Sequence, residues 1–229
     1  MDHALDNPVY SALTTADAGK NIGSTTFCFL NPAIAPFIGM KSWDKEFQKR
    51  LIREIPKDRS WFLLIKGEVK FIKEINVTLS MPLYQFYCPE EKNIPSMNEE
   101  NKIVPLNESN VEEMVALTKL TNPGPFRNRT IEFGNYHGIF EDGKLMAMGG
   151  ERLHVPGMTE ISAICTHPAA QGRGYGNMIV NFLTRDIFQK GEIPFLHVKT
   201  ENKSAIKVYE KQGYKVRERI MFYVIKIIN

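Results

Sequence analysis

Cysteine and long apolar runs are both scarce in this sequence of 229 residues. The three cysteines, Cys28, Cys88 and Cys165, are odd in number and far apart, which argues against a disulfide framework and against a Cys-x-x-Cys metal site. The most apolar stretch, residues 27–40, contains two prolines and falls short of the roughly 18 apolar residues of a membrane span. The first six residues carry acids where a secretory signal carries Lys or Arg. We therefore expect a soluble, cytoplasmic protein that needs neither a metal nor a membrane.

Neither sign of charge dominates the sequence, which has 29 basic and 26 acidic residues and a net charge of +3. Residues 1–100 hold 12 basic and 13 acidic side chains, whereas residues 171–229 hold 11 and 5. This C-terminal excess is modest for a surface that binds duplex nucleic acid, but it suits one small polyanion. A solvated surface, and more weakly a nucleic-acid site, are the alternatives that charge alone leaves open.

A polar stretch with two prolines and four glutamates, residues 89–101, is typical of a linker. It predicts a smaller α+β domain at 1–95, in which we find no catalytic motif, and a second domain at 102–229. In the first part, apolar spacing and β-branched content predict one helix and two strands: 43–55, 61–66 and 71–87.

The second part alternates strand and helix patterns, which predicts an α/β fold with a mixed sheet. An Asp-Gly turn at 142–143 between two apolar runs is a strong hairpin signal. The expected strands are 102–106, 136–140, 144–153, 159–166, 193–199 and 214–228. One expected helix begins after Asn110, and two others cover 175–187 and 202–212.

A glycine-rich turn, Gln171 to Gly176, lies between an expected strand and the first turn of an expected helix. Amide groups at such a helix start lack partners within the helix and can bind a phosphate. The dinucleotide pattern G-x-G-x-x-G fails because its third glycine position is Asn177, and a P-loop fails because Gly176 is not followed by Lys. What remains is the phosphate-binding pattern Gln/Arg-x-x-Gly-x-Gly/Ala, which Gln171, Gly174 and Gly176 satisfy.

This turn resembles the pyrophosphate loop of the GNAT superfamily of acyl-CoA-dependent N-acyltransferases. Downstream, residues 202–214 are similar to the helix that the family writes Asn-x-x-Ala-x-x-x-Tyr-x-x-x-Gly-Phe/Tyr, with Asn202, Ala205 and Tyr209 in the matching positions. Two motifs in the right order, separated by a helix and a strand, are more specific than either alone. The resemblance covers about 102–229 and is greatest to the FR47-like group, while a degenerate copy of the same fold is one interpretation of 1–95.

The resemblance implies that acetyl-CoA is the acyl donor and that the strands 159–166 and 193–199 splay apart to hold its pantetheine arm. It also implies a set of residues that contact the coenzyme. They are Ile164, Cys165, Thr166, Gln171, Gly172, Arg173, Gly174, Tyr175, Gly176, Asn177 and Asn202.

Two residues are our candidates for the chemistry. Tyr209 occupies the tyrosine position of the family's helical motif, and the resemblance implies that it protonates the departing thiolate. Glu160 stands eleven positions before Gln171, the offset of the base glutamate in the histone acetyltransferase branch. A rim carboxylate that only orients the acceptor is an equal alternative for Glu160, and His197 is the reserve candidate for the base.

The acceptor is expected over the loop 121–130, where Phe126, Arg127 and Arg129 are the candidate contacts. Arginine forks match carboxylate geometry, so a small amine such as an amino acid is the expected partner. Transfer of a longer acyl group and a CoA-binding sensor or scaffold without catalysis are the rival interpretations. The oligomeric state stays open, with a homodimer among the options.

Overall fold

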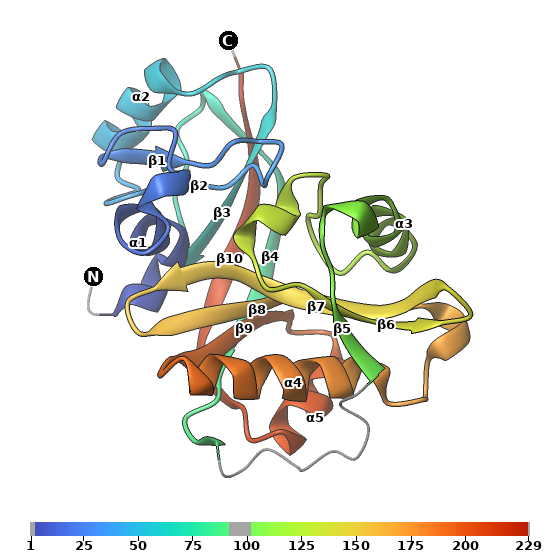
Figure 1. The fold of residues 1–229 in the computed structure, drawn as a ribbon. Helices are drawn as coiled ribbons and strands as arrows, with labels where there is room; N and C mark the ends of the chain where they lie inside the picture. The colour runs from blue at the N-terminus through green and yellow to red at the C-terminus, as the bar shows by residue number, and fades with distance from the viewer. Residues whose placement is uncertain (1–2, 92–101, 229) are drawn as a thin grey trace.

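One eight-stranded sheet runs through the computed structural model, which describes residues 3–91 and 102–228. Its strand order is β3-β10-β4-β9-β8-β7-β6-β5 (Figure 1). The strands are β3 (Ser60–Lys66), β4 (Ile75–Tyr87), β5 (Ile103–Pro105), β6 (His137–Glu141), β7 (Lys144–Val155), β8 (Met158–Thr166), β9 (Ile193–Lys199) and β10 (Lys215–Ile227). Most of the expected linker, residues 92–101, lies outside the described residues.

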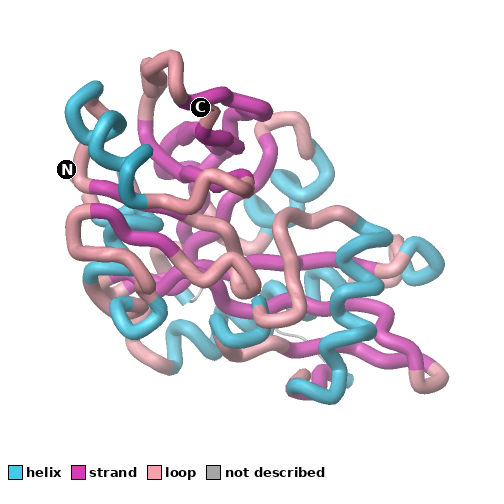
Figure 2. The backbone as a smooth tube through the Cα atoms, turned by 90° about the horizontal axis from the view of Figure 1, so that it is seen from above, coloured by secondary structure: helices cyan, strands magenta, loops and turns pink. Residues whose placement is uncertain are grey.

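Helices cover both faces of this sheet (Figure 1). One face packs against α4 (Tyr175–Gln189) and α5 (Lys203–Lys211), whose apolar side chains form a common core with β8 and β9. The opposite face packs against α1 (Pro8–Thr14) and α3 (Val111–Thr121). Seen from above, the strands run through the middle of the molecule (Figure 2). None of the helices within the described residues is long and apolar enough to cross a membrane.

A smaller layer from the start of the chain lies against the β3 end of the sheet. It consists of α2 (Lys45–Glu54) and a two-stranded sheet of β1 (Phe27–Phe29) and β2 (Ile38–Met40). Trp61 and Leu63 of β3, and Tyr223 and Ile225 of β10, point into the core that this layer shares with the sheet. Because side chains alternate along a strand, the neighbours of these four residues face the other way.

The expected division into 1–95 and 102–229 does not appear in the sheet. Strand β4 lies between β9 and β10 and pairs antiparallel with both, and β3 pairs with the outer side of β10. The N-terminal part therefore supplies an internal strand and an edge strand to the sheet of the C-terminal part. Since pairing between distant segments leaves no local signal in the sequence, this arrangement could not be read from composition.

Strands β8 and β9 pair in parallel only at their first residues, Met158 to Glu160 with Ile193 to Phe195. Beyond that point no pairing between them is present in the described residues, which is the expected splay. Strand β8 also carries an irregularity against β7, where Ala163 has a left-handed φ of 56°. Such a bulge interrupts the alternation of side chains and frees backbone groups from the ladder.

Candidate functional site

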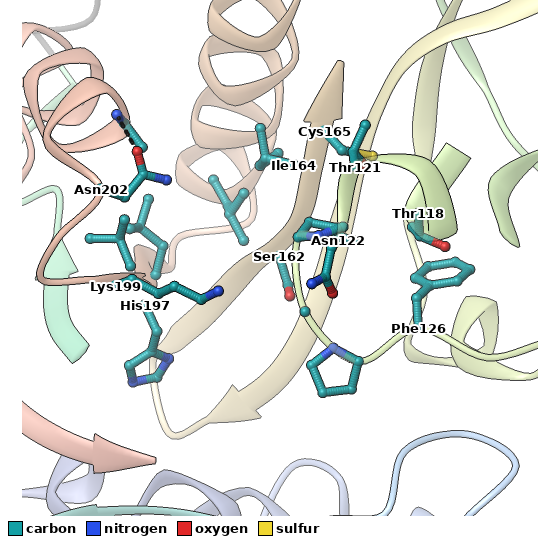
Figure 3. A pocket seen from close by; sticks show the side chains of 18 of the residues that line it. Thr118, Thr121, Asn122, Phe126, Ser162, Ile164, Cys165, His197, Lys199 and Asn202 are labelled. Atoms are coloured by element: carbon teal, nitrogen blue, oxygen red, sulfur yellow. Dashed lines mark hydrogen bonds between the residues drawn. The ribbon is translucent and has the colours of Figure 1, made fainter. Parts of the chain in front are cut away.

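A cavity of about 1000 Å³ opens where β8 and β9 splay. The start of α4 and one side of α5 bound it at one end, and the end of α3 with the following loop bounds it at another. Figure 3 shows Thr121, Asn122 and Phe126 across the space from His197 and Asn202, with Ser162 between them. The cavity thus joins the glycine-rich turn to the loop that we expected to hold the acceptor.

The start of α4 is open for a ligand. Its N-cap is Gly174 in a left-handed conformation, with φ of 83°, and no side chain caps the helix. An added Cβ at Gly176 would lie 3.2 Å from the hydroxyl of Thr166, so a side chain there would fill the approach to the amides. Uncapped amides and the positive end of the helix dipole both favour an anion such as a pyrophosphate.

The predicted coenzyme contacts divide into two groups. Those that line the cavity are Ile164, Cys165, Thr166, Gln171, Gly176, Asn177 and Asn202. Those outside the lining are Gly172, Arg173, Gly174 and Tyr175. The guanidinium of Arg173 and the hydroxyl of Tyr175 both donate to the carboxylate of Glu141 at the surface.

Asn202 and Tyr209 stand at the two ends of α5. The side chain of Asn202 caps the helix by accepting from the amide of Ala205 at 3.1 Å. Tyr209 lines the cavity, and its ring is held between Phe86 and Tyr214, with centroids about 6 Å away on each side. Burial raises the pKa of Tyr209 to about 12, so its hydroxyl keeps its proton at neutral pH.

Glu160 occupies a different setting from the one that a general base needs. Its side chain is fully buried and does not line the cavity. Both carboxylate oxygens accept from the guanidinium of Arg152, at 2.8 and 2.5 Å. Burial alone would raise the pKa of Glu160, but the charge and hydrogen bonds of Arg152, together with the hydrogen bond from His197, outweigh it and lower that pKa to about 2. The geometry therefore favours an ion-pairing role for Glu160.

His197 lies at the cavity wall with both ring nitrogens engaged. Its Nδ1 is 2.5 Å from Glu160, and its Nε2 is 3.0 Å from the amide nitrogen of Gln85. The oxygen of that amide accepts from Arg217, which fixes the amide so that its NH₂ faces the ring. Nε2 must then accept and Nδ1 must carry the proton. The lone pair that a base would use is already occupied.

Cys165 lines the cavity but is a poor nucleophile. Burial raises the pKa of its thiol to about 12, which keeps it protonated. The three cysteines are all free and buried in the described structure.

The expected acceptor residues are only partly brought together. Phe126 and Arg127 line the cavity, whereas Arg129 is exposed, pairs with Glu132 and lies outside the lining. Sequence reasoning missed Arg152, which does line the cavity. An arginine within a long apolar strand was the signal that could have identified it.

Residues from the N-terminal part also line the cavity, although that part carries no motif. They are Phe62 and Leu64 of β3 and Leu79, Met81 and Leu83 of β4. The i, i+2 spacing of these apolar residues was the available signal. Without the sheet order, it could not be assigned to this site.

Comparisons with known proteins agree with this architecture. The profile of the FR47-like protein family matches residues 136–223. A solved structure of a GNAT-family protein from Novosphingobium aromaticivorans is 30% identical, with full coverage of both chains and a TM-score of 0.91. A GCN5-related N-acetyltransferase from Kribbella flavida shares the fold, with a TM-score of 0.63 at 12% identity over 96% of this chain and 95% of that one.

Among curated proteins, a mycothiol acetyltransferase from Mycobacteroides abscessus is 30% identical over 103 residues, which is 41% of this chain and 35% of the relative. A mycothiol acetyltransferase from Streptomyces avermitilis matches at the same identity over 84 residues, or 36% and 27%. The chain therefore matches about a third of the length of the first of these relatives and about a quarter of the second.

Proposed function

This chain belongs to the GNAT family of acetyltransferases, and from this premise we propose that it transfers an acetyl group from acetyl-CoA to a primary amine. The observation that carries the proposal is the course of one cavity. It begins at the uncapped start of α4, follows the gap between β8 and β9, passes Tyr209 and ends under the acceptor loop.

The residues present fit the donor chemically. Gly176, Asn177 and the neighbouring amides would hold the pyrophosphate, and Asn202 lines the same cavity from the start of α5. The freed backbone groups around Ala163 and Ile164 would pair with the pantetheine amides. An amide in this position would also donate to the thioester oxygen as charge develops on it.

The reaction needs no covalent intermediate with the protein. The amine nitrogen attacks the thioester carbonyl carbon, a C–N bond forms and the C–S bond breaks. One proton leaves the nitrogen and one arrives at the sulfur, giving the N-acetyl amine and the free thiol of CoA. Tyr209 is the proposed donor to the sulfur. Glu160 is buried and paired with Arg152, and the Nε2 lone pair of His197 already accepts a hydrogen bond. We therefore propose that water takes the proton from the amine.

An amine panel with acetyl-CoA tests this proposal. The panel contains free amino acids, polyamines and peptides with free N-termini, and thiol release is followed together with the mass of the acetylated product. We expect release that depends on at least one class of amine. Acetyl-CoA binding without transfer to any member would contradict the proposal and favour a CoA-binding sensor.

A further inference from the structure

The cavity wall opposite the coenzyme end carries an apolar surface built by three strands. Register places Leu64, Phe222 and Met81 in one row across β3, β10 and β4, and Phe62, Val224 and Leu79 in the next. All six side chains line the cavity, and we call them the apolar platform. The platform is not closed over, since Leu79 is 42% exposed.

The reverse side of the same strands explains why the platform faces the cavity. Trp61, Leu63, Tyr223 and Ile225 alternate with the platform residues and are buried against α2 and the small sheet. The platform is therefore the cavity-facing side of this strand trio, where Leu64 is buried and Phe62, Met81 and Phe222 are partly packed against the core. An apolar body placed on it would remove apolar area from water, which is favourable.

Charge around this cavity has one sign. Four cationic side chains line it: Lys119, Arg127, Arg152 and Lys199. Among the described residues, no Asp or Glu belongs to the lining. Such a wall disfavours a polycationic acceptor and favours one that carries a negative charge. Coenzyme phosphates bound at the open start of α4 would lie away from the platform, so they would not account for a cation beside it.

Arg152 is the cation beside the platform. Its guanidinium lies 5.2 Å from the ring centroid of Phe37, and that ring packs edge-on against Phe62 of the platform, at 5.9 Å between centroids. Glu160 engages only Nε and Nη2, while no hydrogen bond within the described residues uses Nη1. The guanidinium has five N–H groups, so the fork between Nη1 and Nη2 can still donate two hydrogen bonds to the carboxylate of a ligand.

The geometry points to an acceptor that combines these two features. We propose that the amine acceptor is a carboxylate-bearing apolar amine, such as an apolar amino acid, whose carboxylate binds Arg152 and whose apolar group lies on the platform. This inference rests on the proposed acetyl transfer and names its substrate class. Glu160 is then a positioning residue, because it holds the guanidinium at a fixed angle while the Phe37 ring supports it.

A matched set of acceptors tests the carboxylate directly on the unaltered protein. Leucine, leucinamide and isopentylamine share the apolar group and differ in the carboxylate, and glycine keeps the carboxylate without the apolar group. With acetyl-CoA saturating, we expect kcat/KM for leucine to exceed that of each other member by about 10- to 100-fold. Leucinamide is the more stringent control, since its amine has a lower pKa than that of leucine and a larger fraction of it is unprotonated. Without a carboxylate contact, leucinamide would therefore be the better nucleophile.

Substitutions test whether Arg152 causes the preference for a carboxylate-bearing acceptor. Removing Arg152 alone would leave Glu160 as a buried unpaired charge, so the test variant is the double substitution Arg152→Gln/Glu160→Gln. We expect it to raise KM for leucine at least about tenfold while KM for acetyl-CoA stays within about twofold. Arg59→Gln makes the same change at an exposed site whose ion-pair partner among the described residues is Asp58, and it should leave both values unchanged.

Three outcomes overturn the inference. If kcat/KM for leucinamide or isopentylamine equals that for leucine, Arg152 and Glu160 are only a structural ion pair. Faster turnover with octanoyl-CoA than with acetyl-CoA, without any leucine preference, would place an acyl chain on the platform. Transfer only to polyamines or peptides would remove the substrate class while leaving acetyl transfer in place. Failure of every amine would instead contradict the proposed function.

Discussion

Tyr209 is the residue on which the proposed chemistry depends most. Its hydroxyl stays protonated because burial raises its pKa to about 12, and its ring is fixed by Phe86 and Tyr214. We expect Tyr209→Phe to lower kcat about tenfold and to leave KM for acetyl-CoA nearly unchanged, since a thiolate whose conjugate acid has a pKa near ~8.5 needs only modest help. Steady-state kinetics with a saturating acceptor measures both values.

Tyr87→Phe is the matched control for this substitution. Tyr87 ends β4, is partly buried and does not line the cavity, so its loss of a hydroxyl should not change kcat. If kcat of Tyr209→Phe equals that of the unaltered protein, the hydroxyl of Tyr209 has no part in the reaction.

Glu160 shows what a single sequence can and cannot predict about a residue. Its separation from Gln171 in the sequence suggests a base, and strict strand alternation would place it on one face with Ser162 and Ile164. Alternation predicts a face but not the partner on it, and the left-handed Ala163 breaks the alternation before Ile164. The partner, Arg152, lies on the neighbouring strand, and no motif connects the two.

At the scale of elements, one charged cluster joins three parts of the fold. His154 of β7 bonds through Nδ1 to Asp17, near the start of the chain, at 3.0 Å and through Nε2 to Glu151 at 3.1 Å. Lys190, at the end of α4, also reaches Glu151, at 2.7 Å. Burial alone would lower the pKa of His154, but the hydrogen bonds that its ring donates to the two carboxylates raise that pKa to about 9.

This cluster makes stability depend on pH. The folded pKa of His154 lies above the ordinary 6.5, so its contribution is complete below pH 6.5 and is lost as the pH rises through about 9. We expect His154→Gln to lower the free energy of unfolding by about 2 kcal/mol near pH ~6 and by much less near pH ~10. Urea unfolding followed by circular dichroism gives both values. An equal loss at the two pH values would show that the charge of His154 is not what stabilises the fold.

Most elements of the C-terminal part follow from local signals. The helical period predicted α4 to within two residues, the Asp-Gly turn predicted the β6–β7 hairpin, and Asn202 and Gly213 bracket α5. Each signal is a property of neighbouring residues. The acceptor side of the cavity was predicted less well, because its walls come from β3, β4 and β10, which meet only in the folded sheet.

At the scale of the whole molecule, the N-terminal part completes the sheet as well as lining the cavity. Its strand β4 separates β9 from β10, so removing it would expose two long unpaired strand edges. We expect residues 102–229 alone to show no cooperative unfolding transition by circular dichroism. A urea transition similar to that of the full chain would mean that this fragment folds without β4 and that the two parts are separable domains.

The central claim is that the open start of α4 binds the pyrophosphate of acetyl-CoA, and calorimetric titration of the full chain with acetyl-CoA tests it most directly. We predict saturable one-site binding that Gly176→Val weakens at least about tenfold, because the new side chain fills the approach to the amides. Gly19→Val, at a position with no atom within 4 Å of the added Cβ, should bind as the unaltered protein does. Absence of binding to the unaltered protein, or equal affinity in Gly176→Val, would contradict the claim.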